Sequence, residues 1–294
     1  MLQVLANSVI YASEIAIIAV GVALAYSILR FANFAHIQYA VAGGYISYAL
    51  TQAGLSIVPA IAISAAATGL GAILIDRLVF SRLRSTSPEG KMIVSWGVAL
   101  LLRSLIAAVF GGGARVFDVE IEPVQIGDVI VTTLDIAVVA TTVVAMAVLH
   151  LLLQRTRLGT ALRALASNRD LAVTRGIPAE RMTALMWFIS GAFAAIGGTL
   201  FAMETRLQPS MDLVILLPVF AAVTIGGLTS ARGAVIGALV LSLAQNFAIA
   251  IDFGSWLTGT PWYLPTQFRD AIAVGALVLV LILRPRDRVV GGAR

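Results

Sequence analysis

Residues 154–183 read QRTRLGTALRALASNRDLAVTRGIPAERMT and form a basic loop between two long apolar segments. The loop holds six arginines and two acidic residues, namely Arg155, Arg157, Arg163, Arg169, Arg175 and Arg181 against Asp170 and Glu180. When a chain inserts into a membrane, short loops rich in arginine stay on the cytoplasmic side. This basic loop therefore predicts both an orientation for the chain and a surface exposed to the cytoplasm.

The composition of the whole chain is that of a membrane protein. Of the 294 residues, 60% are hydrophobic and only 12% are charged, and the mean hydropathy is +0.97. Apolar runs of about 20 residues, the length that crosses a bilayer as a helix, recur along the chain. Because no polar stretch approaches the size of a domain, residues 1–294 are expected to form a single all-α, polytopic transmembrane bundle with about eight to ten membrane segments.

The distribution of charge predicts how this bundle is oriented. Basic residues dominate the loop near 77–91, the basic loop and the tail from Arg284, whereas acidic residues dominate 111–131. Nine spans with the N-terminus outside and the C-terminus in the cytoplasm place each of these segments on its preferred side. The expected spans are roughly 5–29, 34–52, 56–79, 92–110, 132–153, 184–204, 213–228, 233–251 and 269–283.

Motifs for catalysis or cofactor binding are absent from the sequence. The chain has no cysteine and only two histidines, so thiolate chemistry and clustered metal ligands are not expected. Gly90 and Lys91 are followed by Met92, and no glycine precedes Gly90 by five residues, so there is no phosphate-binding Walker loop. We therefore expect neither an enzyme nor a metal or cofactor site. The net charge of +5 serves topology rather than binding to nucleic acid.

Two charged residues lie inside apolar runs. A charge there must face the protein interior or a water-filled cavity, so Glu14 and Arg103 are candidates for a solute pathway. The alternative is that Glu14 reaches water at the outer interface, while Arg103 snorkels or pairs within the bundle. His36, at the start of the second run, is interpreted as a hydrogen-bonding residue of a helix terminus.

The basic loop contains residues that are expected to begin and end short helices. Leu158-Gly159 is expected to end the preceding span, and 160–166 to form a short helix that presents Leu162 and Leu165. Asn168 is a predicted N-cap for a second short helix over 169–174, with Gly176 in the position after its end. The resulting amphipathic surface either docks a soluble partner or lies on anionic lipid headgroups.

Three Gly-Gly pairs lie inside or at the ends of apolar runs. Gly43–Gly44 and Gly197–Gly198 are interpreted as sites of close helix packing, with broken helices as the alternative. Gly226–Gly227 is expected to form either a tight turn between spans or unwound backbone that lines a cavity.

Several stretches, in order along nearly the whole chain, resemble a known family, the permeases of branched-chain amino-acid ABC transporters of the LivH/LivM type. The chain is closer to the LivH type, and it departs from the pattern at Ile37-Gln38, Arg232, Glu14 and Arg103. The stretches that carry the resemblance are 10–13 (IYAS) with 29–36 (LRFANFAH), 163–170 with 176–181, 222–237, and Arg284-Pro285.

The resemblance implies an all-helical subunit of an ATP-binding cassette importer in a bacterial inner membrane. The implied partners are a second homologous permease, two cytoplasmic ATPase subunits and a periplasmic binding protein, with membrane lipid around the bundle. Alternating access driven by the ATPases would move leucine-type amino acids inward. The alternative cargoes are urea, short amides or small organic acids, and the alternative class is an ATP-independent carrier or channel.

The resemblance also implies roles for residues of this chain. A passage for an apolar amino acid should be mostly apolar with a few polar groups. The expected pathway residues are Ser13, Glu14, Asn33, Tyr39, Arg103 and Thr224. The residues expected to couple the chain to an ATPase are Arg163, Leu165, Asn168, Arg169, Asp170 and Gly176.

Overall fold

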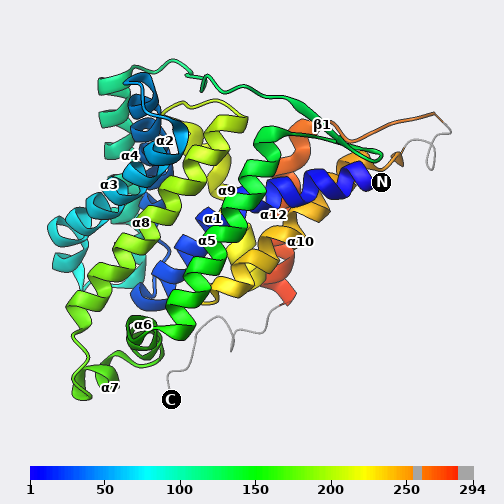
Figure 1. Cartoon of the computed structure of the whole chain (residues 1–294). Helices are drawn as coiled ribbons and strands as arrows, with labels where there is room; N and C mark the ends of the chain where they lie inside the picture. Colours follow the sequence, from blue (N-terminus) through cyan, green and yellow to red (C-terminus); the bar gives the residue numbers. More distant parts are fainter. Residues whose placement is uncertain (254–259, 284–294) are drawn as a thin grey trace.

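The computed structural model describes residues 1–253 and 260–283, and almost all of their regular structure is helical (Figure 1). The tail from Arg284, which we predict to be cytoplasmic, lies outside the described residues. The helices are α1 Leu2–Leu29, α2 Ala35–Gln52, α3 Ile57–Leu78, α4 Pro88–Phe110, α5 Thr133–Arg155, α6 Arg157–Ser167, α7 Arg169–Thr174, α8 Ala179–Glu204, α9 Met211–Gly226, α10 Ala231–Ala250 and α12 Arg269–Leu283, with 3-10 turns at Phe80–Leu83 and Thr266–Phe268.

The long helices run back and forth between two ends of the molecule. The start of α1 lies at one end, and α6 and α7 lie at the opposite end (Figure 1). At the α6–α7 end, the Arg30 guanidinium donates a hydrogen bond to the Ala166 carbonyl, and Arg84 forms an ion pair of 3.1 Å with Glu180. The described basic loops therefore gather at one end, as the charge count predicts.

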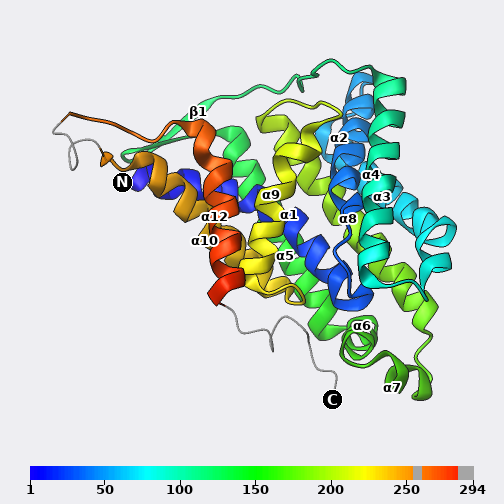
Figure 2. The ribbon, with the colours of Figure 1, turned by 180° about the vertical axis from the view of Figure 1, so that it is seen from behind.

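Seven of the described helices are long and apolar enough to cross a membrane, which is fewer than the nine expected spans. The two exceptions are α2 and α9. With 16 residues, α9 is about 24 Å long at 1.5 Å per residue, which is shorter than a hydrocarbon core of about 30 Å. Both helices nevertheless run between the same two ends as their neighbours (Figures 1 and 2). The predicted order of segments is therefore kept, although α9 is short and α2, with 18 residues, is less apolar than the other spans.

The core of the bundle is built around α1 and α8. In their most apolar windows 83% and 72% of the residues are buried, against 17% for α4, 17% for α5 and 6% for the segment that contains α12. In Figure 2, α4 and α12 stand at the two sides of one face of the bundle, with α9 between them. The peripheral helices thus present apolar faces that only lipid or another protein can cover.

Glycines allow α2 and α8 to cross at close range. A Cβ atom on Gly43 would overlap the backbone of Ala195, and one on Gly198 would overlap the backbone of Ala40. Small residues of this kind let transmembrane helices approach closely. The close-packing interpretation of these two pairs is therefore confirmed.

The third pair, Gly226–Gly227, forms a tight turn. Gly226 ends α9, Gly227 has a φ of +101°, and Ser230 caps α10 by accepting a hydrogen bond of 2.9 Å from the Gly233 amide. A Cβ atom on Gly226 would overlap the Gly233 carbonyl, so only glycine lets the two helices meet here. The segment is therefore a turn, and its non-helical residues Leu228, Thr229 and Ser230 also line cavities, so the two predicted alternatives both apply.

A short hairpin, absent from the sequence prediction, lies outside the bundle at the end opposite α6 and α7. Strand β1 (Pro123–Ile126) pairs antiparallel with β2 (Val129–Thr132). Gly127 has a φ of +61°, which suits a two-residue turn. The Gln3 side chain both donates to and accepts from the Ile130 backbone at 2.9 Å, and so ties the hairpin to α1.

Candidate functional site

The basic loop folds into two short helices held by caps. The Thr156 hydroxyl accepts a hydrogen bond of 3.0 Å from the Gly159 amide, so α6 begins at Arg157. Leu158-Gly159 therefore belongs to α6, and the expectation that it ends the preceding span is wrong. Asn168 accepts a bond of 3.0 Å from the Leu171 amide and Gly176 has a φ of +81°, which confirms both the predicted N-cap and the predicted helix end.

The apolar residues of the two helices divide into an inner and an outer set. Leu162 and Leu165 are only 1% and 3% exposed, so the side of α6 that presents them packs against the bundle. The outward apolar residues are instead Leu158, Leu171 and Val173, which are 48% to 56% exposed. We call the set Leu158, Leu171, Val173, Arg169 and Arg175 the α6–α7 surface, since all five side chains are exposed.

The predicted coupling residues occupy different parts of this region. Arg169 and Asp170 are exposed in the first turn of α7. Arg163 donates to the Gln154 side chain and, at 3.4 Å, to the Thr160 hydroxyl, and it lines a cavity beside α1. Leu165 is buried on the side of α6 that packs against the bundle. The structure thus exposes Arg163, Arg169 and Asp170, whereas Leu165 is buried.

A direct hydrogen bond joins α6 to the end of α1. Arg30 follows the last residue of α1 and adopts a left-handed conformation with a φ of 58°. Its guanidinium donates to the carbonyl of Ala166 near the end of α6. This bond connects the end of α6 to the residue that follows α1. Sequence analysis did not assign this role to Arg30, although it lies within a stretch that carries the family resemblance.

Arg103 does not stand alone in the membrane region. It forms an ion pair with Asp212 in the first turn of α9, and the two side chains are 22% and 5% exposed. The pair bridges α4 and α9. The structure therefore contains one of the two arrangements predicted for Arg103, namely pairing within the bundle. Asp212 was missed because it precedes the expected span 213–228.

Glu14 lies elsewhere in the bundle. It is only 2% exposed, so the alternative that it reaches water is wrong. Its charged neighbours include Glu204 at the end of α8 and Arg269 at the start of α12. The Arg269 guanidinium donates a hydrogen bond of 2.7 Å to Asn246 and lies 5.0 Å from the centre of the Tyr11 ring. Glu14 and Arg103 therefore belong to separate polar clusters.

The remaining predicted pathway residues have mixed surroundings. Three of them are buried: the Ser13 hydroxyl donates to the Val9 carbonyl at 2.8 Å, Asn33 accepts from the Ala35 amide at 3.2 Å, and the Tyr39 ring is only 2% exposed. None of the three lines a cavity described here.

Thr224, by contrast, lines a cavity. We call it the Thr224 cavity; it has a volume of about 610 Å³ and lies among α1, α4, α9 and α12 at the α6–α7 end. Its wall is mostly apolar, and Tyr26, Arg30 and Glu89 add polar groups. Of the six predicted pathway residues, Thr224 is the one that faces this space.

Comparison with known proteins places the chain in a family. Residues 4–288 match the family described as branched-chain amino acid transport system / permease component. The chain belongs to this permease family. The permease is 28% identical to the high-affinity branched-chain amino acid transport system permease protein BraD of Pseudomonas aeruginosa, with 97% of this chain and 94% of BraD covered. It is 27% identical to LivH of Salmonella typhimurium, with the same coverage of each chain.

A solved structure is also similar to the permease at low identity. It is PsaBC from Streptococcus pneumoniae in complex with Fab, at 14% identity and a TM-score of 0.48, with 96% of this chain and 92% of that chain covered. The family match confirms the resemblance, including the closeness to LivH, over nearly the full chain. This permease is therefore a multi-pass inner-membrane transporter subunit rather than an enzyme.

Proposed function

We propose that this permease is a membrane subunit of an ATP-binding cassette importer that carries branched-chain amino acids from the periplasm to the cytoplasm. The observation that carries the proposal is the family match over residues 4–288. The relatives BraD and LivH are named as permeases of high-affinity branched-chain amino acid transport. The expected orientation, with the N-terminus outside and the C-terminus inside, places the α6–α7 surface in the cytoplasm.

In this proposal the α6–α7 surface docks on an ATPase subunit. Exposed Leu158, Leu171 and Val173 offer apolar area, and the exposed Arg169 and Arg175 add positive charge to the same two-helix segment. An exposed apolar patch rimmed by charge is typical of a protein-binding site. Closure of two ATPases would push α6, and the bond from Arg30 to Ala166 would pass the movement to α1. The arrangement supports ATP-driven alternating access over an ATP-independent carrier.

A second homologous permease would cover the face that holds the Thr224 cavity. The helices α4 and α12, which flank this face, have few buried residues. The substrate would then pass between the two permeases, after delivery by a periplasmic binding protein. A mostly apolar wall with a few polar groups suits leucine, isoleucine or valine, although it would also pass a small amide.

Co-purification of the complex tests the docking step. We expect the double variant Arg169→Glu/Leu171→Asp to insert normally but to lose bound ATPase subunits, because it reverses charge and removes apolar area on the α6–α7 surface. The matched control is Arg206→Glu, which reverses an exposed arginine in the connection between α8 and α9, at the opposite end. Equal ATPase retention by both variants would contradict docking at this surface.

Uptake by proteoliposomes that contain the full complex tests the substrate. We expect uptake of leucine, isoleucine and valine that requires both ATP and the binding protein. Uptake of urea or acetamide with none of these amino acids would reject the amino-acid assignment and leave the importer mechanism standing. Uptake by the permease without ATPase subunits would instead favour a secondary carrier.

A further inference from the structure

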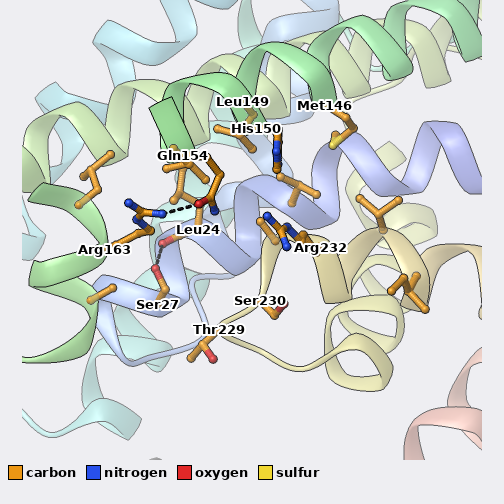
Figure 3. A pocket seen from close by; sticks show the side chains of 17 residues that line it. Leu24, Ser27, Met146, Leu149, His150, Gln154, Arg163, Thr229, Ser230 and Arg232 are labelled. Carbon is orange, nitrogen blue, oxygen red and sulfur yellow. Dashed lines mark hydrogen bonds between the residues drawn. The ribbon is translucent and has the colours of Figure 1, made fainter. Parts of the chain in front are cut away.

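A second cavity lies at the α6–α7 end, on another side of the bundle from Thr224. We call it the Arg232 cavity; it has a volume of about 610 Å³ and is enclosed by α1, α5, α6 and the start of α10 (Figure 3). Its apolar wall is formed by side chains from all four helices. They are Val20, Leu24, Met146, Leu149, Leu153, Leu162, Val235 and Ile236.

The polar residues of this cavity gather around one opening. Figure 3 shows Gln154 between Arg163 and His150, with Arg232 beside His150. The lining includes two arginines and no acidic residue. Ser230 caps α10, so the N-terminus of this 20-residue helix adds a positive dipole end to the same opening. The opening is thus positively charged, with nothing in its lining to neutralise it.

Several polar residues of the lining lie nearer the α6–α7 end than the apolar residue Met146 does. His150, Gln154 and Arg163 lie near the end of α5 and in α6, where the chain leaves the span. Met146 lies nine residues before Arg155, the last residue of α5, and is therefore about 13 Å deeper at 1.5 Å per residue. A ligand that fills the cavity must be apolar inside the membrane and anionic at its surface.

We propose that the Arg232 cavity binds an anionic phospholipid of the cytoplasmic leaflet. One acyl chain lies against Met146, Val235 and Ile236 between α5 and α10, and the phosphodiester meets Arg163 and Arg232. Basic pockets between transmembrane helices on the cytoplasmic side are known to take such headgroups. A soluble anion would leave the apolar wall unused, and a zwitterionic lipid would bring an ammonium group to two arginines.

The position of the lipid gives it a structural consequence. Arg163 belongs to α6 and Arg232 to the first turn of α10, so one headgroup bridges the basic loop and the turn between α9 and α10. This second bridge is independent of the bond from Arg30 to Ala166. Lipid binding would hold α6 in place whether or not a partner covers the α6–α7 surface.

Native mass spectrometry of the purified full-length chain tests the proposal. The probes are phosphatidylglycerol and phosphatidylcholine with identical acyl chains. We expect preferential retention of phosphatidylglycerol, and about fivefold weaker apparent affinity in Arg232→Gln, because one basic side chain near an anionic headgroup contributes about 1 kcal/mol. The matched control Arg77→Gln removes an exposed arginine at the end of α3, outside the cavity, and should leave the affinity unchanged.

Two other variants test the proposal if Arg232→Gln does not fold. Arg232→Lys should retain the preference for phosphatidylglycerol, and Val235→Trp should reduce binding of both lipids by filling the apolar wall. Equal retention of the two lipids, or an equal loss in Arg77→Gln, would overturn the proposal. Displacement of phosphatidylglycerol by millimolar inorganic phosphate would assign the site to a soluble anion and would overturn it as well.

Discussion

The ion pair between Arg103 and Asp212 supports a quantitative prediction. The two residues join α4 to α9 beside the face that holds the Thr224 cavity, and both lie where water is scarce. The Asp212 side chain is 5% exposed, whereas that of Arg103 is 22% exposed. Because the two side chains differ in exposed fraction, removing one should not cost the same as removing the other.

Arg103→Leu leaves the buried Asp212 carboxylate without its partner. Removing one partner of a buried pair costs about 3–5 kcal/mol, and partial exposure of Arg103 together with the N-terminal dipole of α9 reduces the expected loss to about 2–3 kcal/mol. Asp212→Leu leaves an arginine whose long side chain can turn toward water, so we expect a loss of about 1 kcal/mol. The double variant should lose less than the sum, with a coupling free energy of at least about 1 kcal/mol.

Denaturant unfolding of the detergent-solubilised permease provides the double-mutant cycle. Arg206→Leu, which removes an exposed arginine in the connection between α8 and α9, is the control and should shift the midpoint little. Additive losses at Arg103 and Asp212, within about 0.5 kcal/mol, would refute the ion pair as a bond between α4 and α9. Equal losses from the two single variants would refute the argument from exposure.

Two further predictions concern packing and topology. Gly198→Ala should destabilise the bundle by about 1–3 kcal/mol because its new Cβ overlaps the Ala40 backbone. The control Gly71→Ala, with no atom within 4 Å of its Cβ, should not destabilise it. Equal unfolding midpoints of the two variants would contradict the close crossing of α2 and α8. Ile121→Cys should react with a membrane-impermeant thiol reagent at the periplasmic face, and Thr174→Cys only after the inner membrane is opened; the reverse labelling pattern would invert the topology.

Local signals in the sequence were sufficient for the membrane class, the order of the segments and the two ends of α7. Hydropathy measures transfer to lipid residue by residue, so α1, α5 and α8 can be recognised without knowledge of their neighbours. Asn168 could be assigned as an N-cap because its side chain bonds an amide three residues away. The charge count likewise separated the two ends of the bundle, since loop charge is a one-dimensional property.

The tertiary structure alone decided which polar groups meet and which faces are covered. Asp212 pairs with Arg103 across a separation of 109 residues, and Arg269 joins the cluster around Glu14 from α12. Leu165 faces inward although the pattern allowed either direction, because α6 packs on the bundle through that side. A spanning helix is apolar on all sides, so its sequence does not specify which face meets protein and which meets lipid. Only the packing of the helices makes that choice, and the two cavities follow from it.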